Sequence, residues 1–346
     1  MPLSPIIVRS PLNLFLGAGA SAPLGKLLMG DFIERIAVEV KDNDLRTMLQ
    51  YLIKFRGGDL EALLGELETI IGLNYAQSVD GTVHGSSGSA PYSFSLSVSV
   101  ARTLLRRIKH LIIQEYRFID RQKSVELYEP LFDLLFSTIG PEQCLVVFTT
   151  NYDLAIEEFC EERYADYNLC DGFAHGVTGR YNFWSRSNFD GFQPDSAKRN
   201  VVLFKIHGSV DWVHSKAIDK ITRGPAMFDA LDSDAYSNVL IYPATNKITT
   251  VDPYYSGYEY LHRCSEKALK LLAIGYSFRD YEATTRLRSA VALNDQLHLV
   301  LVSPNADKAV PGIPIPTQQK SSINGSFGEA ECLEEIKKVL TREVSS

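Results

Sequence analysis

Residues 12–22, LNLFLGAGASA, join a short apolar run to a glycine turn. Continuous apolar runs of this length are typical of strands that are covered on both faces of a parallel sheet. The turn Gly17–Ala22 fits the pattern G-x-G-x-x-A, whose glycines allow a tight turn and a close approach of the backbone to a phosphate. A helix that follows the turn would add unpaired N–H groups and a favourable dipole. An ordinary strand-to-helix turn with Ser21 as its cap explains the same residues, so the motif alone leaves both readings open.

Five further apolar runs are likewise continuous rather than alternating. They are Leu145–Thr149, Val201–Ile206, Val239–Tyr242, Leu271–Ile274 and His298–Val302. Helix-like stretches lie between them, and this alternation favours a layered α/β fold. The sequence therefore predicts a Rossmann-like parallel sheet with helices on both faces.

The chain between the first two predicted strands is much longer than one crossover needs. Five stretches in it have the apolar spacing of helices: Asp31–Val40, Asp44–Phe55, Leu60–Leu73, Val100–Phe118 and Glu126–Ser137. We predict a helical subdomain, residues 31–137, inserted into a Rossmann-like domain of residues 1–30 and 138–346. The Gly- and Ser-rich segment 80–99 is expected to be a flexible loop. Residues 178–199 and 304–328 are predicted to be irregular, ahead of a terminal helix, Glu329–Thr341.

The composition is that of a globular protein with a large core. Of the 346 residues, 45% are hydrophobic and 22% are charged, which argues against disorder and fibre. The net charge of −7 argues against strong direct binding of nucleic acid through a basic surface. No apolar run reaches the roughly 18 residues of a membrane helix, and the N-terminus lacks a cleavable signal. We therefore expect a cytoplasmic protein that does not enter a membrane.

The cysteines are scattered and odd in number, and they form no CxxC pair: Cys144, Cys160, Cys170, Cys264 and Cys332. This pattern is typical of reduced, buried thiols in a cytosol. The spacing excludes a four-cysteine zinc site, and we expect no metal.

Ligands of open parallel sheets bind beyond the carboxyl ends of the strands. The second predicted strand is followed by Thr149-Thr150-Asn151-Tyr152-Asp153 and a predicted helix, Leu154–Arg163. Asp153 or Asn151 can cap this helix. An asparagine at this place can also hold sugar hydroxyls or orient a water, and Asp153 can supply negative charge or fix the loop.

The third strand runs into His207-Gly208. An isolated histidine is more often a structural hydrogen-bonding group than a catalytic one, but His207 would face the same crevice as Asn151 and could act as a base. After the fifth strand, Gly275 and Ser277 can meet ribose or phosphate, or Ser277 or Asp280 can simply cap a helix. After the sixth, Asn305 can read an adenine edge or make a turn.

Together these motifs resemble the Sir2 (sirtuin) superfamily. Gly17–Ser21 is similar to its phosphate-binding GAGxS, Thr150–Asp153 to its TQNxD, and His207-Gly208 to its catalytic HG. The segments Gly275–Ser277 and Ser303–Asn305 resemble its late ribose and adenine motifs. The wording GAGAS, TTNYD, KIHGS and GYSFRD is most similar to SIR2-like domains of bacterial antiphage defence proteins.

The resemblance, which spans Asn13 to Asn305, implies an NAD site. Its implied catalytic residues are Asn151, His207 and Asp153. Its implied cofactor-binding residues are Gly17, Ala18, Gly19, Ala20, Ser21, Thr150, Gly275, Ser277 and Asn305. Sirtuin deacylases carry a zinc module with two CxxC pairs, which this sequence lacks, whereas defence-type SIR2 domains generally consume NAD without that module.

The resemblance therefore implies an NAD+ hydrolase that releases nicotinamide and ADP-ribose, and that acts in antiphage defence by depleting NAD+. An NAD-dependent protein deacylase, a non-catalytic nucleotide-sensing or assembly module, and an ADP-ribosyl transferase remain alternatives. The implied partners are further copies of the chain, and a HerA-type ATPase or a short Argonaute.

Overall fold

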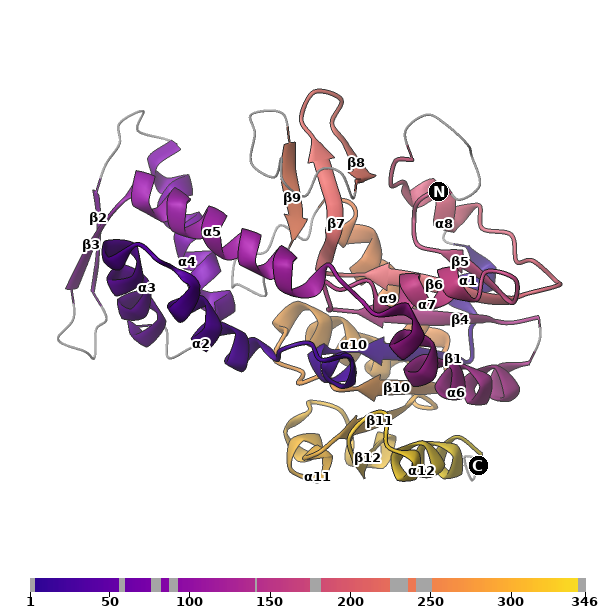
Figure 1. The fold of residues 1–346 in the computed structure, drawn as a ribbon. Coiled ribbons are helices and arrows are strands. Elements are labelled where there is room, and N and C mark those ends of the chain that lie inside the picture. The colour runs from indigo at the N-terminus through magenta and orange to yellow at the C-terminus, as the bar shows by residue number, and fades with distance from the viewer. Residues whose placement is uncertain are drawn as a thin grey trace.

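The computed structural model describes residues 4–55, 60–75, 82–86, 93–140, 142–174, 182–224, 236–240 and 251–341. Its centre is a seven-stranded sheet in the order β12-β11-β10-β1-β4-β6-β5 (Figure 1). The strands are β12 Lys320–Asn324, β11 His298–Ser303, β10 Lys270–Ile274, β1 Leu12–Leu16, β4 Cys144–Thr149, β6 Arg199–Lys205 and β5 Tyr167–Cys170. All neighbouring pairs are parallel. The predicted Rossmann-like parallel sheet is thus confirmed.

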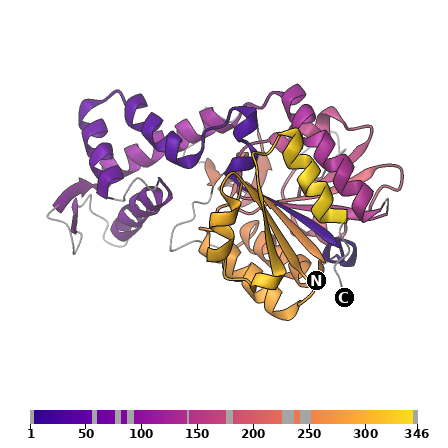
Figure 2. The ribbon, with the colours of Figure 1, turned by 90° about the horizontal axis from the view of Figure 1, so that it is seen from below.

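Both faces of the sheet are buried. Successive side chains of a strand point to opposite faces, so each strand contributes to two hydrophobic cores. Phe15, Val146 and Phe148 lie in one core, and Leu14 and Val147 lie in the other. The first core is covered by α1 Pro5–Val8, α8 Arg186–Asp190, α9 Tyr254–Lys267 and α10 Tyr281–Leu293. The second is covered by α6 Arg121–Ile139, α7 Ala155–Glu162 and α12 Ala330–Thr341. Helices therefore lie on both sides of the strands (Figure 2).

Four helices form a third hydrophobic core beside the sheet. They are α2 Met29–Glu39, α3 Asn43–Phe55, α4 Leu60–Tyr75 and α5 Val98–Tyr116, close to the predicted ranges. Figure 1 shows them as a separate group. Helix α6, in contrast, packs its buried side chains against the sheet. The separate core supports a helical insertion, and the boundaries 31 and 137 stay a prediction.

The prediction of a flexible loop over residues 80–99 is wrong where the segment forms two strands. β2 Thr82–Ser86 and β3 Ser93–Ser97 pair antiparallel, with Thr82 opposite Ser97. The sequence SFSLS alternates polar and apolar residues, which is a strand pattern that the abundance of Ser and Gly conceals. Residues 80, 81 and 87–92 lie outside the described ranges, and Val98 begins α5.

The described part of the predicted strand Val239–Tyr242, residues 239 and 240, does not join the parallel sheet. β9, Tyr236–Leu240, pairs with β7 Gly208–Ser215 in an antiparallel sheet that also holds β8 Lys220–Arg223. The partner of β9, β7, begins at Gly208, just after β6 ends at Lys205. So short a link cannot make the crossover to a parallel neighbour, and β7 therefore pairs with β9 in a separate antiparallel sheet. Residues 241 and 242 lie outside the described part of the chain.

The two segments predicted to be irregular contain further elements. Helix α8 lies in the first of them, whose residues 178–181 are outside the described ranges. The second holds α11 Ala306–Ala309, the 3₁₀ turns η4 Val310–Gly312 and η5 Thr317–Gln319, and strand β12. Among the described residues, no helix is long and apolar enough to span a bilayer.

Candidate functional site

The glycines of the first turn allow two backbone segments to pack together. Gly17 N donates to Ile274 O at 2.9 Å, and Gly19 N donates to Gly275 O at 3.1 Å. A Cβ atom on Gly17 would lie 2.5 Å from Gly275 O, and one on Gly275 would lie 2.5 Å from Gly19 Cα. Gly275 also has a φ of +62°, which favours glycine. All three glycines are therefore required by the contact between the β1 and β10 loops.

The helix expected directly after this turn is absent at that place, and the prediction was wrong. The turn itself contains a 3₁₀ turn, η1 Ala18–Ala20, a second one, η2 Ala22–Leu24, comes next, and α2 begins only at Met29. Ser21 does not cap a helix with its side chain. The dipole of an α-helix is therefore not available at the glycine turn, because dipole effects fall off within the first turn.

Ser21, Asn151 and Asp153 form a hydrogen-bonded network between the β1 and β4 loops. Nδ2 of Asn151 donates to Gly17 O at 3.0 Å and to Ser21 Oγ at 2.9 Å. Ser21 Oγ donates to Asp153 Oδ2 at 2.7 Å, and Asp153 Oδ1 accepts from Ala155 N at 3.0 Å. Asp153 thus contacts both the first residue of α7 and the glycine turn, whereas the N-cap position of α7 is occupied by Leu154 and not by Asp153 or Asn151.

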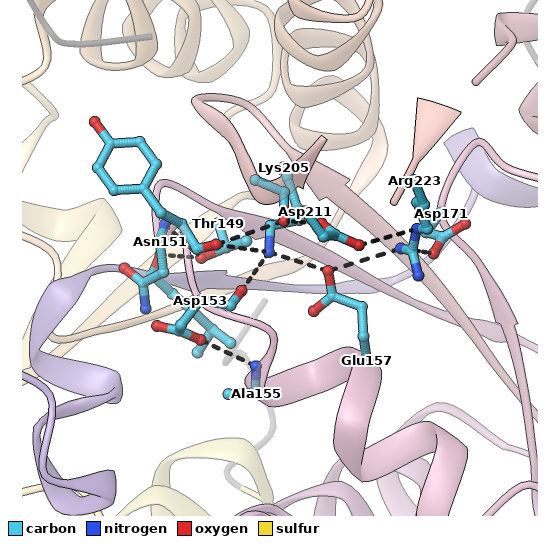
Figure 3. Close-up of polar contacts among 12 residues, drawn as sticks. Thr149, Asn151, Asp153, Ala155, Glu157, Asp171, Lys205, Asp211 and Arg223 are labelled. Atoms are coloured by element: carbon cyan, nitrogen blue, oxygen red, sulfur yellow. Dashed lines mark hydrogen bonds and ion pairs between the residues drawn. The ribbon is translucent and has the colours of Figure 1, made fainter. Parts of the chain in front are cut away.

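Lys205 contacts the backbone of this network, although in the sequence it is predicted only to be part of an apolar strand. Its buried Nζ donates to the carbonyl oxygens of Asp153 and, at 3.4 Å, of Tyr152, and pairs with Glu157 Oε1 at 3.0 Å (Figure 3). A lysine inside an apolar run signals a buried partner, since buried charges are almost always paired.

The buried charges continue from Glu157 to the antiparallel sheet. Arg223 of β8 pairs with Asp171, lies 3.4 Å from Asp211 Oδ2, and lies 3.9 Å from Glu157 Oε1 (Figure 3). Burial raises the pKa of Glu157, although Lys205 and Arg223 oppose that change. This network ties β6, α7 and the antiparallel sheet together around the residues that precede and follow His207.

Helix α5 contacts the segments that follow β1 and β4. Lys26 Nζ donates to Glu115 O at 2.7 Å, and Tyr116 Oη donates to Leu27 O at 2.7 Å. The ring of Tyr116 lies 6.3 Å from that of Tyr152. The helical part of the chain is therefore in contact with the β1 and β4 loops.

His207 lies in the link between β6 and β7 and is only 3% exposed. Gly208, which follows it, has a φ of +83°, and a Cβ atom there would lie 1.9 Å from Val239 O. The glycine thus admits β9 beside His207. Nε2 of His207 lies 2.6 Å from Asp280 Oδ2, which also accepts from Tyr258 Oη at 3.1 Å. From the sequence, Asp280 is predicted only to cap a helix.

Four loops at the carboxyl ends of β1, β4, β6 and β10 form a closed ring of contacts. The contact between His207 and Asp280 closes the ring. It joins the loops of β6 and β10, between which β1 and β4 lie, so the two strands are about three spacings of ~4.8 Å apart in the sheet. The other members of the ring are loops of neighbouring strands. The four contacts join Gly19 to Gly275, Asn151 to Gly17, Tyr152 to Val210, which lies in β7 just after the β6 loop, and His207 to Asp280.

A cavity of about 710 Å³ lies beside this ring, on the side of β10 and β11. Gly19 and Gly275 line it, together with Ser303, Lys123 and Glu126. Its volume is in the range of small-molecule sites. Neither Asn151 nor His207 is among its lining residues, so this cavity borders the glycine contact rather than the histidine.

The remaining residues of the expected site are spread along the same edge. Thr150 is half-buried, and its N–H donates to Leu16 O at 3.2 Å. Ala18, Ser277 and Asn305 are exposed, and Ala20 is buried. Asp280, not Ser277, caps α10, and Asn305 precedes α11 without a side-chain capping bond.

The five cysteines lie in the two hydrophobic cores of the sheet. All five are buried and form no disulfide. Burial raises the pKa of Cys144 to about 11 and, with Asp171, that of Cys170 to about 12. Within the described ranges, no group of three or more His, Cys, Asp or Glu residues is placed to hold a metal ion.

Comparisons with known proteins assign the chain to a family. No curated protein matches it. Among solved structures it is similar to a Sir2 homologue in complex with NAD, at 14% identity and a TM-score of 0.47, over 97% of this chain and 93% of that one. It is also similar to a Sir2 homologue mutant in complex with ADP-ribose, at 13% identity and a TM-score of 0.46, over 98% and 97%. The sequence model of the SIR2-like domain matches residues 145–322, more than half of the chain, and the chain therefore belongs to the SIR2-like family.

Proposed function

We propose that the chain hydrolyses NAD+ to nicotinamide and ADP-ribose. The observation that carries this proposal is the ring of loops, which brings Ser21, Asn151 and Asp153 to the same edge of the sheet as His207. Membership of the SIR2-like family supports NAD-dependent chemistry of the Sir2 type. Crevices at the carboxyl ends of parallel strands are the usual dinucleotide sites of such sheets.

The residues suit the chemistry of a cationic leaving group. Nicotinamide leaves NAD+ as a neutral molecule and needs no proton, so the paired carboxylates of most glycosidases are unnecessary. The site has to hold the diphosphate, stabilise an oxocarbenium-like ribose and direct a water to its anomeric carbon. We assign the first task to the exposed side of the turn Gly17–Ser21, with Gly275, Ser277 and Asn305 toward the adenosine.

The orientation of Asn151 limits what it can offer the substrate. Both N–H groups of its amide are directed to protein acceptors, Gly17 O and Ser21 Oγ. The group left for a ligand is the carbonyl oxygen Oδ1, an acceptor that suits a ribose hydroxyl or the attacking water. We assign His207 as the base that accepts the proton, because an unprotonated imidazole nitrogen can take a proton from a hydroxyl group or a water.

The direct test measures release of nicotinamide from NAD+ by the purified full chain. His207→Ala and Asn151→Ala should each lower the rate by about 10²–10⁴-fold. His214→Ala is the matched control, because Nε2 of His214 also pairs with a carboxylate, Asp219, at 2.8 Å, but on the surface. Full activity of either site variant would remove the mechanism. Binding of NAD+ without turnover in every assembly state would favour a sensing module instead.

A second arm of the assay separates hydrolysis from deacylation. We expect the same rate with and without an acetylated peptide, because the chain has no CxxC pair with which to build the zinc module of sirtuin deacylases. Nicotinamide release that requires the peptide would favour a deacylase. ADP-ribose attached to protein or nucleic acid would identify a transferase.

We further propose that this activity serves antiphage defence by depletion of cytoplasmic NAD+. A free NAD+ hydrolase would harm its own cell, so we expect control through self-assembly or through a partner such as a HerA-type ATPase or a short Argonaute. Light scattering of the chain alone and mixed with each candidate, run beside the nicotinamide assay, tests this part.

A further inference from the structure

Asp280 and His207 form a buried pair that the motifs do not reveal. The residues are 73 positions apart in the sequence, yet Nε2 and Oδ2 lie 2.6 Å apart. The side chain of His207 is 4% exposed and that of Asp280 is 3% exposed. A short hydrogen bond between an imidazole and a carboxylate in such surroundings is strong, because water does not compete for it.

The surroundings of Asp280 favour its ionised form. Besides His207, its carboxylate accepts from Tyr258 Oη at 3.1 Å and from Glu282 N and Ala283 N at 3.0 and 3.3 Å. The last two donors belong to the first turn of α10, where the helix dipole also favours a negative charge. These three donors, which do not depend on the tautomer of His207, stabilise the carboxylate over the acid.

We propose that Asp280 is a positioning residue that holds His207 as the tautomer with the proton on Nε2. An ionised carboxylate only accepts hydrogen bonds, so Nε2 must donate to it. In the neutral imidazole the basic nitrogen is then Nδ1. This role rests on the proposed NAD+ hydrolysis, in which His207 is the base.

The reaction balances with this assignment. The bond between ribose and nicotinamide breaks, and its electron pair stays on the nicotinamide nitrogen, which becomes neutral. The oxygen of water forms the new bond to the anomeric carbon, and one proton of that water passes to Nδ1 of His207. The imidazolium that results lies against the Asp280 carboxylate, whose negative charge stabilises it, and the proton is later released to solvent.

Asp280→Asn tests the role with little disturbance of the fold. Asparagine caps a helix about as well as aspartate, so α10 should remain intact. The amide removes the charge and can place an N–H group toward Nε2, which favours the wrong tautomer. Where a carboxylate orients a catalytic histidine, this change lowers kcat by on the order of 10⁴. We expect a loss in kcat of about 10²–10⁴-fold with KM within a few-fold.

The control is Asp219→Asn, which alters the exposed pair with His214. It should leave kcat and KM unchanged. A folded Asp280→Asn protein with the kcat of the wild type would overturn the assignment, as would an equal loss in both variants.

Nitrogen-15 spectra of labelled histidine give a readout that does not need turnover. With the imidazole neutral, His207 of the wild type should show a protonated Nε2 and an unprotonated Nδ1, and Asp280→Asn should shift this balance. The signal is identified by its absence in His207→Gln. A wild-type spectrum with the proton on Nδ1 would overturn the proposal even if the variant does not fold. Absence of NAD+ cleavage by a wild type with the expected tautomer would instead contradict the proposed function alone.

Discussion

The hydroxyl of Ser21 lies 2.9 Å from the amide nitrogen of Asn151 and accepts its hydrogen bond. The same hydroxyl donates to Asp153 at 2.7 Å. One small side chain therefore connects the glycine turn to both polar residues of the β4 loop. Without it, the side-chain amide of Asn151 would lose this acceptor and keep its hydrogen bond to the carbonyl oxygen of Gly17.

Ser21→Ala should lower both stability and activity. It leaves Oδ2 of the buried Asp153 without its hydroxyl donor, and loss of one partner of a buried polar group costs about 1–3 kcal/mol. Because Asn151 loses an orienting contact, we also expect kcat/KM for NAD+ to fall at least about tenfold, which corresponds to ~1.4 kcal/mol of transition-state stabilisation. Urea unfolding and nicotinamide release measure the two effects.

The matched control for this variant is Ser10→Ala. Ser10 is equally buried, and its hydroxyl donates to Leu12 O at 2.9 Å and Cys144 O at 2.8 Å, at the amino ends of β1 and β4. It should lose a similar stability and keep its activity. An equal loss of activity in both variants would show that Ser21 matters only for folding.

Gly275→Ala should be much more destabilising than Gly25→Ala. Both glycines have positive φ values, +62° and +78°, so each substitution bears the cost of the left-handed conformation, about 1–2 kcal/mol. Only at Gly275 would the new Cβ meet backbone atoms, at 2.5 Å, whereas nothing lies within 4 Å at Gly25. The clash should add about 1–3 kcal/mol. Equal unfolding free energies for the two variants would contradict the close contact of the β1 and β10 loops.

The central part of the fold was predictable because continuous apolar runs identify strands that are buried on both faces. LNLFL and LVVFT, for example, became neighbouring strands of the sheet. The polar edge strand KSSIN carried no such signal, since an edge strand needs little apolar surface. The run VLIY was misassigned because apolar content alone does not distinguish parallel from antiparallel pairing.

In the candidate site, too, the sequence predicts some residue positions and not others. Asn151 and His207 could be placed at one edge because parallel strands direct their carboxyl ends to the same side. Asp280 could not be matched to His207, because two strands separate their loops and the contact depends on how each loop folds back. Lys205 was missed because its place in a strand predicts burial but does not name the carbonyl groups that receive its charge.

Lys205→Met should destabilise the fold by about 3–5 kcal/mol, because it leaves the buried Glu157 without its nearest cation. Lys198→Met is the control: Nζ of this half-buried lysine donates to the carbonyl oxygen of Tyr164 at 2.6 Å, and loss of that bond should cost no more than about 0.5 kcal/mol. Adding Glu157→Gln to Lys205→Met should recover part of the loss in urea unfolding. A double variant with the full sum of both single losses would contradict the coupling of Lys205 to Glu157.

His298 should make the fold less stable as pH falls below neutrality. Burial, together with Lys270, lowers the pKa of His298 from its ordinary value of 6.5. Below 6.5 the unfolded chain therefore binds a proton that the folded chain does not, so the unfolding free energy falls with pH through this window. His298→Gln removes the group, and the difference in unfolding free energy between about pH 7.5 and about pH 5.5 should become smaller than in the wild type. A larger difference in the variant would mean that the folded protein holds the proton more tightly, for instance through Ser321, whose Oγ lies 3.0 Å from Nε2.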